Sequence, residues 1–347
     1  MITEKQKLYL CYFVSRATFL GIGFSLIMNY SSKDSWASSI LGYVIGLLIV
    51  CVIKKIMDYK KGKTLDEILN KNISNVILRI LIILFCLYVI FQSYFILQTF
   101  MTSFFLTVTP PFYVILPFIL IILFVVSKGV RNIAKVSESL FWFCLAIPVI
   151  ILIVLYQYVN LEHFLPIFTT KPDNFLYSSL IFGVLSSVPN MFLMNIKNDG
   201  KNLIKMYSLS VLTLIIIAIV IMGVFGSELA LIYRYPEYMM LKKIKILSFI
   251  EKIENIVSVI WIIDGFFMVG LASHTVYDLL PKKHNKKIGI LLAIIIFYIT
   301  SFVVGQNYIT RLSLYYKTPI IYLVGFIVIG LPLFIKTRKI RQEKNTN

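Results

Sequence analysis

Asp264 is an ionisable residue in a place where ionisable residues are rare. It lies in the stretch WIIDGF, about ten residues inside an apolar run at 255–280. A carboxylate in the middle of a hydrocarbon layer costs about 2.5–3.5 kcal/mol on insertion scales, so such a residue is a candidate for function. It suits a counter-charge for a ligand ammonium, or a site for a cation or proton. The alternative is a protonated side chain that hydrogen-bonds to a neighbouring helix.

Two other apolar runs contain residues that weaken helices. These are Gly21, Gly23 and Ser25 in FLGIGFS, and Ser186, Ser187 and Asn190 in LIFGVLSSVPNMFL. A helix break exposes main-chain N–H groups that carry partial positive charge and bind a carboxylate without Arg or Lys. The hydroxyl and amide side chains add hydrogen bonds to a ligand, or equally to another helix.

Three further sets of polar residues are weaker candidates. Tyr94 and Gln98 lie one turn apart on one helix face, where they wall a cavity or pack against another helix. Arg16 lies about 10 Å along the first apolar run, by helix rise. We expect its side chain to snorkel to the membrane interface, and an ion pair at a cytoplasmic gate is the alternative. His274 and Asp278 have the spacing of metal ligands but lack a third, so we expect an interfacial pair.

The composition identifies the environment of these residues. The chain has 347 residues, is 59% hydrophobic and has a mean hydropathy of +0.87, which indicates a polytopic membrane protein. A helix needs about 20 apolar residues to cross the hydrocarbon layer. Ten runs meet this need, at 8–29, 36–57, 78–103, 111–127, 138–158, 175–196, 206–226, 255–280, 288–305 and 319–336.

The basic residues predict the topology. One side of the ten spans, with both termini, holds 24 of the 34 Lys and Arg residues, and the other side holds nine. This bias places both termini in the cytoplasm. The first span lacks a small-residue cleavage site, so we expect it to be retained. The outer segment at 227–254 alternates apolar and basic residues, and we expect part of it to lie as an amphipathic helix on the outer surface.

Several functional classes find no support in the sequence. The net charge of +18 comes from short loops, with no basic, aromatic-rich soluble segment for nucleic acid. The four cysteines are scattered without ligand spacing, so we read them as small buried apolar residues. The loops are too short for a catalytic constellation or a phosphate loop. We therefore expect no enzyme activity, metal or cofactor.

The breaks in the first and sixth spans hold matching positions if the chain consists of two related halves of five spans. We predict one transmembrane domain with repeats at about 8–158 and 175–336 and a short basic tail at 337–347. Paired interrupted segments point to a binding site near the midplane, because irregular backbone at that depth must line protein or a water-filled cavity. The alternative is that Gly and Ser only permit close helix packing.

Local sequence strings then suggest a family. They are KDSWASSILG, GKTLDEIL, TPPFYVILPF, SKGVRNIAKVSESLF, NLEHFLPIF, GVFGSELALIYRYPEY and FIEKIENIVSVIWIIDGF. Their order and spacing run through nearly the whole chain. In these strings the chain resembles the B subunits of GerA-type spore germinant receptors, a family of endospore germination permeases within the amino acid/polyamine/organocation (APC) transporter superfamily.

The resemblance implies an all-α, ten-helix LeuT-like fold with broken first and sixth helices in the spore inner membrane. It implies recognition of a small nutrient germinant, usually an amino acid, together with an A subunit and a lipoprotein C subunit. The chain departs from the family pattern where SSVPN lacks a following carboxylate and where Asp264 replaces a small neutral residue. A secondary amino acid transporter, which would use the same cavity, is the alternative function.

Overall fold

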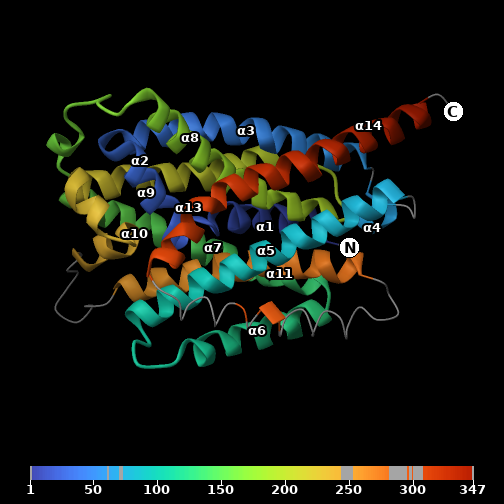
Figure 1. The fold of residues 1–347 in the computed structure, drawn as a ribbon, viewed down its shortest axis with the longest axis horizontal. Helices are drawn as coiled ribbons and strands as arrows, with labels where there is room; N and C mark the ends of the chain where they lie inside the picture. Colours follow the sequence, from blue (N-terminus) through green and yellow to red (C-terminus); the bar gives the residue numbers. More distant parts are fainter. Residues whose placement is uncertain are drawn as a thin grey trace.

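The fold is a bundle of helices that run along the long axis of the molecule (Figure 1). The computed structural model describes residues 2–345 except 61, 70–72, 244–252, 281–294, 297–298 and 300–307. Its elements are α1 (Glu4–Arg16), η1 (Phe19–Gly23), α2 (Phe24–Ser31), η2 (Ser32–Asp34), α3 (Ser35–Tyr59), α4 (Leu65–Ile68), α5 (Ile73–Phe104), α6 (Pro111–Ser127), α7 (Val130–Leu155), η3 (Tyr156–Tyr158), η4 (Leu161–Phe164), α8 (Pro172–Ser187), η5 (Val188–Asn195), α9 (Leu203–Ile232), α10 (Pro236–Met239), η6 (Met240–Lys243), α11 (Ile253–Leu279), α13 (Tyr308–Gly325), η7 (Phe326–Gly330) and α14 (Leu331–Asn345).

The expected spans correspond to these elements. Seven helices in the described part of the chain are long and apolar enough to cross a membrane. The shorter α6 and the divided unit α1–η1–α2 supply the fourth and first spans. The ninth expected span, at 288–305, lies almost wholly outside the described residues. The all-α membrane fold is therefore confirmed, whereas the division into two sequence repeats stays a prediction.

Both expected helix breaks are present, and local backbone chemistry explains each. In the first span, Gly21 adopts φ +71° inside the π-helical turn η1, a conformation that favours glycine. In the sixth span, Pro189 lies in the first turn of the 3-10 helix η5, which replaces the α-helix from Val188 onward. Proline supplies no N–H for the helix ladder, so the α-helical pattern ends there.

Small residues also serve close packing, as the alternative interpretation held. A side chain at Gly183 of α8 would place its Cβ 2.6 Å from the carbonyl oxygen of Gly42 in α3. A Cβ at Gly42 would lie 2.6 Å from the carbonyl oxygen of Ser179. These glycines let the second and sixth spans approach closely. Gly183 is thus a packing residue, and the break begins one turn later.

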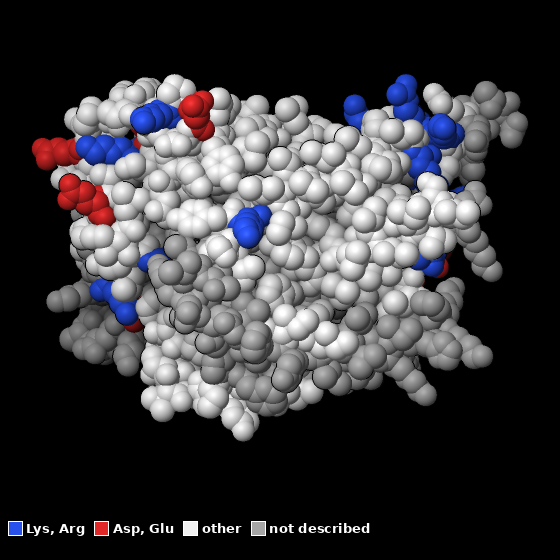
Figure 2. All heavy atoms as spheres, in the orientation of Figure 1, with Lys and Arg blue, Asp and Glu red and all other residues white. Residues whose placement is uncertain are grey.

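Charged side chains gather at the two ends of the bundle in the view of Figure 2, with an almost uncharged band between them. α1 begins and α14 ends at the same end of the molecule (Figure 1). That end is mainly basic in this view, whereas the other end shows acidic and basic residues together (Figure 2). The distribution fits a membrane-spanning bundle and the charge bias of the sequence.

Candidate functional site

The two helix breaks lie side by side in the core. Thr18 of the first span donates its Oγ1 hydrogen to the carbonyl oxygen of Leu185, 2.7 Å away in the sixth span. Asn190 donates from Nδ2 to Ser15 Oγ over 2.9 Å. All four residues are buried. The matched interruptions of the sequence therefore form one central region.

The polar residues of the sixth span are hydrogen-bonded within the protein. Ser186 Oγ lies 2.8 Å from the hydroxyl of Tyr207, and Ser187 Oγ donates to the carbonyl oxygen of Gly183 over 2.6 Å. Asn190 also donates to the carbonyl oxygens of Ser186 and Ser187. A ligand that used these side chains would have to exchange with such bonds.

The first-span candidates have three different environments. The N–H of Gly21 donates to Glu237 Oε1 over 3.0 Å. Gly23 packs against Phe19, whose Cδ1 would lie 2.5 Å from a Cβ at that position. Ser25 is half-buried, and its carbonyl oxygen accepts from Asn29 Nδ2 over 2.8 Å. Gly21 is therefore the candidate that presents a break N–H to a carboxylate.

The partner of Gly21 lies in the outer segment at 227–254, part of which we expected on the outer surface. In this segment Tyr235, Pro236, Glu237 and Tyr238 are buried, whereas residues 244–252 lie outside the described part of the chain. Their aromatic rings pack against the third span, with the Tyr235 and Tyr238 rings 5.3 and 5.4 Å from the ring of Phe100. The central part of this segment therefore packs inside the protein, and a surface helix elsewhere in 227–254 stays a prediction.

Asp264 forms an ion pair with Arg16. Their carboxylate Oδ2 and guanidinium Nη2 atoms lie 3.2 Å apart, and both side chains are 3% exposed. Arg16 also donates to the hydroxyl of Tyr12 and lies over its ring, 4.8 Å from the centroid. The expected snorkelling of Arg16 is therefore wrong, because the buried carboxylate holds its side chain inside the bundle. Asp264 Oδ1 has no hydrogen-bond partner among the residues that the structure describes.

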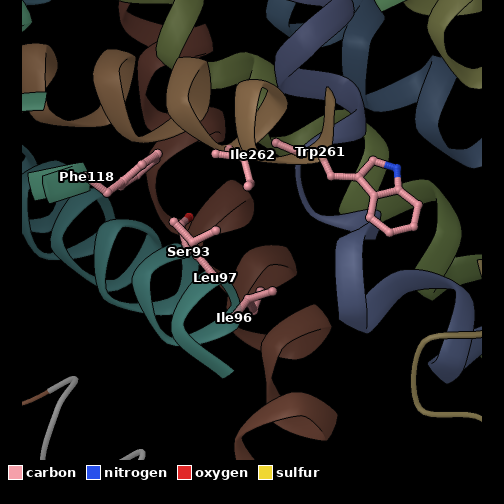
Figure 3. A pocket seen from close by; sticks show the side chains of 8 residues that line it. Ser93, Ile96, Leu97, Phe118, Trp261 and Ile262 are labelled. Atoms are coloured by element: carbon pink, nitrogen blue, oxygen red, sulfur yellow. The ribbon is translucent and has the colours of Figure 1, made fainter. Parts of the chain in front are cut away.

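A small cavity is lined in part by the residues that directly follow Arg16 and Asp264 in sequence, Ala17 and Gly265. It has a volume of about 20 Å³ and is lined by Ala17, Ser93, Ile96, Leu97, Phe118, Trp261, Ile262 and Gly265. Figure 3 shows three of these side chains on α5, with Phe118 across from them and Trp261 and Ile262 on α11. This volume suits about one water molecule.

Tyr94 and Gln98 do not share the side of α5 that faces the break. Ile96 is the α5 residue beside Gly21, with Cγ2 3.4 Å from a Cβ built there. Tyr94, two residues earlier, packs edge-on against Phe118 at 5.9 Å. Gln98 follows Tyr94 by one turn and is fully buried. Neither its amide oxygen nor its nitrogen is hydrogen-bonded to any residue that the structure describes.

The other end of the sixth span is held by charged groups. The buried ammonium of Lys60 donates to the carbonyl oxygens of Met194 (2.7 Å) and Ile196. Asn195 donates from Nδ2 to Asp278 Oδ2 over 2.8 Å, and His274 Nδ1 lies 3.0 Å from the same oxygen. His274 and Asp278 thus form the expected pair. Together these contacts fix the end of η5.

Sequence reasoning missed Glu237 and the role of Arg16. Glu237 lies in YRYPEYMM, an aromatic stretch in which the one acidic residue was the available signal. Arg16 was recognised as an intramembrane charge, and the unmatched Asp264 in the eighth span was its natural partner by charge alone.

Comparisons with known proteins agree with this architecture. A family profile described as spore germination protein matches residues 10–309. The chain is 23% identical over 287 residues to spore germination protein XB of Bacillus anthracis, which covers 77% of this chain and 78% of that protein. It is 24% identical over 244 residues to the putative spore germination protein YfkT of Bacillus subtilis (strain 168), with 68% and 67% covered.

The fold is similar to that of a solved membrane protein. The crystal structure of MhsT in complex with L-phenylalanine matches with a TM-score of 0.64 over 98% of this chain and 97% of that one. The two sequences are 13% identical, so the likeness concerns the fold. The arrangement is accordingly the LeuT-like fold that the resemblance implied.

Proposed function

The chain belongs to the spore germination protein family, and from this premise we propose that it is the germinant-recognition subunit of a spore germinant receptor. The proposed germinant is a small nutrient, namely an amino acid. The proposed setting is the spore inner membrane with both termini in the cytoplasm, and the proposed partners are an A subunit and a lipoprotein C subunit.

The amino acid assignment is supported by two buried groups of opposite chemistry, one in the first span and one in the eighth. The break in the first span provides a main-chain donor at Gly21 for a carboxylate. Among the described residues, Oδ1 of Asp264 has no partner, and this oxygen suits a ligand ammonium. A zwitterion matches both groups, with Arg16 holding Asp264 in position.

The small volume of this cavity supports a mechanism in which ligand binding changes the conformation of the protein. We infer that an amino acid, for which a cavity of about 20 Å³ has no room, binds a more open state of the protein. A ligand shifts an equilibrium between two states only by its difference in affinity for them. An amino acid that binds only the open state therefore drives the chain toward that state, which the partner subunits sense.

The test is genetic. Spores that lack this chain should lose the germination response to one amino acid, and a restored copy should recover it. Germination by a trigger that does not depend on amino acids is the control and should be unchanged. Normal responses to every amino acid in the deletion strain would contradict the proposal.

A secondary amino acid transporter is the second candidate, because the LeuT-like fold favours it. The two functions differ in one measurement. A transporter would accumulate a labelled amino acid in proteoliposomes that contain this chain alone, whereas the receptor subunit would bind the amino acid without accumulation. Substrate uptake that exceeds that of protein-free liposomes would favour the transporter.

A further inference from the structure

Glu237 is a buried carboxylate, and one of its two oxygens accepts a hydrogen bond from a described residue. Its side chain is 1% exposed. Oε1 accepts from the N–H of Gly21 over 3.0 Å, across a separation of 216 residues in sequence. Within the described part of the chain, Oε2 has no partner. Burial of a carboxylate is costly unless it is well paired. Its position therefore calls for an explanation other than stability.

The Gly21 N–H is the kind of donor that a ligand carboxylate needs. Gly21 interrupts the helix with φ +71°, and N–H groups at a break carry partial positive charge. We propose that Glu237 is a tethered substitute for the ligand carboxylate, which the ligand must displace from the Gly21 N–H in order to bind. This inference rests on the proposed function and deepens it, because it assigns the carboxylate donor and requires a ligand with a free carboxylate.

Displacement of Glu237 would also move the two tyrosines close to it in sequence, Tyr235 and Tyr238. Tyr235 lies directly against the break, with Cε1 2.5 Å from a Cβ built on Gly21. Tyr238 packs on Phe104 with ring centroids 4.4 Å apart. Because Glu237 lies between these two tyrosines in the short helix α10, its departure from the break removes the rings as well. The outer closure and the occupancy of the Gly21 N–H are thereby coupled.

The exchange is chemically balanced. A ligand carboxylate replaces the Glu237 carboxylate as acceptor, so the Gly21 N–H stays satisfied, and Glu237 regains hydration on the outer side. A ligand without a carboxylate would leave this N–H or its own polar group unpaired in the interior. The tethered carboxylate therefore selects against neutral analogues and gives the ligand its difference in affinity between the closed and open states.

The experiment measures competition directly. Twenty amino acids are screened against the purified wild-type protein by thermal shift, and the amino acid with the largest effect is titrated, alongside its carboxamide analogue. The variants are Glu237→Leu, which removes the competing carboxylate, and Glu237→Asp, which withdraws it by one methylene but keeps the charge. Glu228→Leu is the matched control. Glu228 is exposed near the end of α9, so its substitution removes the same charge from the outer side without altering the break.

Both Glu237 variants should bind the amino acid about tenfold more tightly than wild type, since one charge-assisted hydrogen bond no longer competes. The control should match wild type, and the carboxamide should bind every protein at least tenfold more weakly. Unchanged or weaker binding by both Glu237 variants, with normal binding by wild type, would overturn this inference and leave the proposed function intact. Binding of no amino acid by any of the four proteins would overturn the proposed function and this inference with it.

Discussion

The ion pair between Arg16 and Asp264 is the contact whose partial removal should harm the protein most. Asp264→Leu leaves the guanidinium buried without a counter-charge, and Arg16→Met does the same to the carboxylate. The double variant removes both charges and leaves two apolar side chains of suitable size. We therefore expect each single variant to be much less stable than wild type, and the double variant to recover much of the loss.

The geometry sets the magnitude. Two unit charges at the observed 3.2 Å attract by about 5 kcal/mol at an effective dielectric constant of about 20. Loss of one partner of a buried pair typically costs about 3–5 kcal/mol, and replacement of both by apolar residues is often neutral. The double-mutant cycle should accordingly give a coupling energy of about 3 kcal/mol or more.

The assay is reversible denaturant unfolding of the four purified proteins in detergent. The pair Lys54 and Asp58 provides the matched control, because its charged atoms lie 3.8 Å apart and both side chains are 37% exposed. Exposed pairs at this spacing contribute about 0.3–0.5 kcal/mol. A coupling energy for Arg16 and Asp264 as small as that of the control would refute the reasoning, since burial would then add nothing to the pair.

Three further expectations follow from the packing, the charges and the topology. Gly183→Ala should lower the free energy of unfolding by about 1–3 kcal/mol, because its Cβ would lie 2.6 Å from a carbonyl oxygen. Gly270→Ala is the control: the nearest neighbour of its Cβ would lie at 3.5 Å, so it should be neutral or stabilising by up to about 1 kcal/mol. Both are measured by the same unfolding assay. Burial lowers the pKa of Lys60 from 10.5 to about 7. Between about pH 7 and pH 10.5 the unfolded chain therefore binds more protons than the folded protein, and stability should rise with pH. Lys60→Met should flatten this rise in a pH series of melting temperatures, and an unchanged slope would contradict the lowered pKa of Lys60. In a background without other cysteines, Val108→Cys should react with an impermeant thiol reagent added to intact cells. Lys128→Cys should react only after the cells are opened. The reverse pattern would exclude cytoplasmic termini.

The sequence by itself determined the spans and the breaks, because both depend on local properties. An apolar run of about 20 residues must form a helix in lipid, where every main-chain polar group needs an internal partner. The conformational freedom of Gly21 and the missing N–H of Pro189 interrupt two of these helices wherever the helices pack. The family strings add the arrangement of the helices, which the comparison of folds confirmed.

Tertiary structure decided which groups meet. Arg16 and Asp264 each stood out as an intramembrane charge, but their pairing depends on the facing sides of the first and eighth spans. The rotation of α5 brings Ile96 rather than Tyr94 to the break, and an apolar helix of that kind carries no periodicity strong enough to predict its rotation. Glu237 lies in a segment that the sequence assigned in part to the membrane surface, and only its insertion between the spans placed a carboxylate on the Gly21 N–H. Contacts between distant segments depend on the complementarity of whole surfaces, which local patterns of hydrophobicity and charge do not encode.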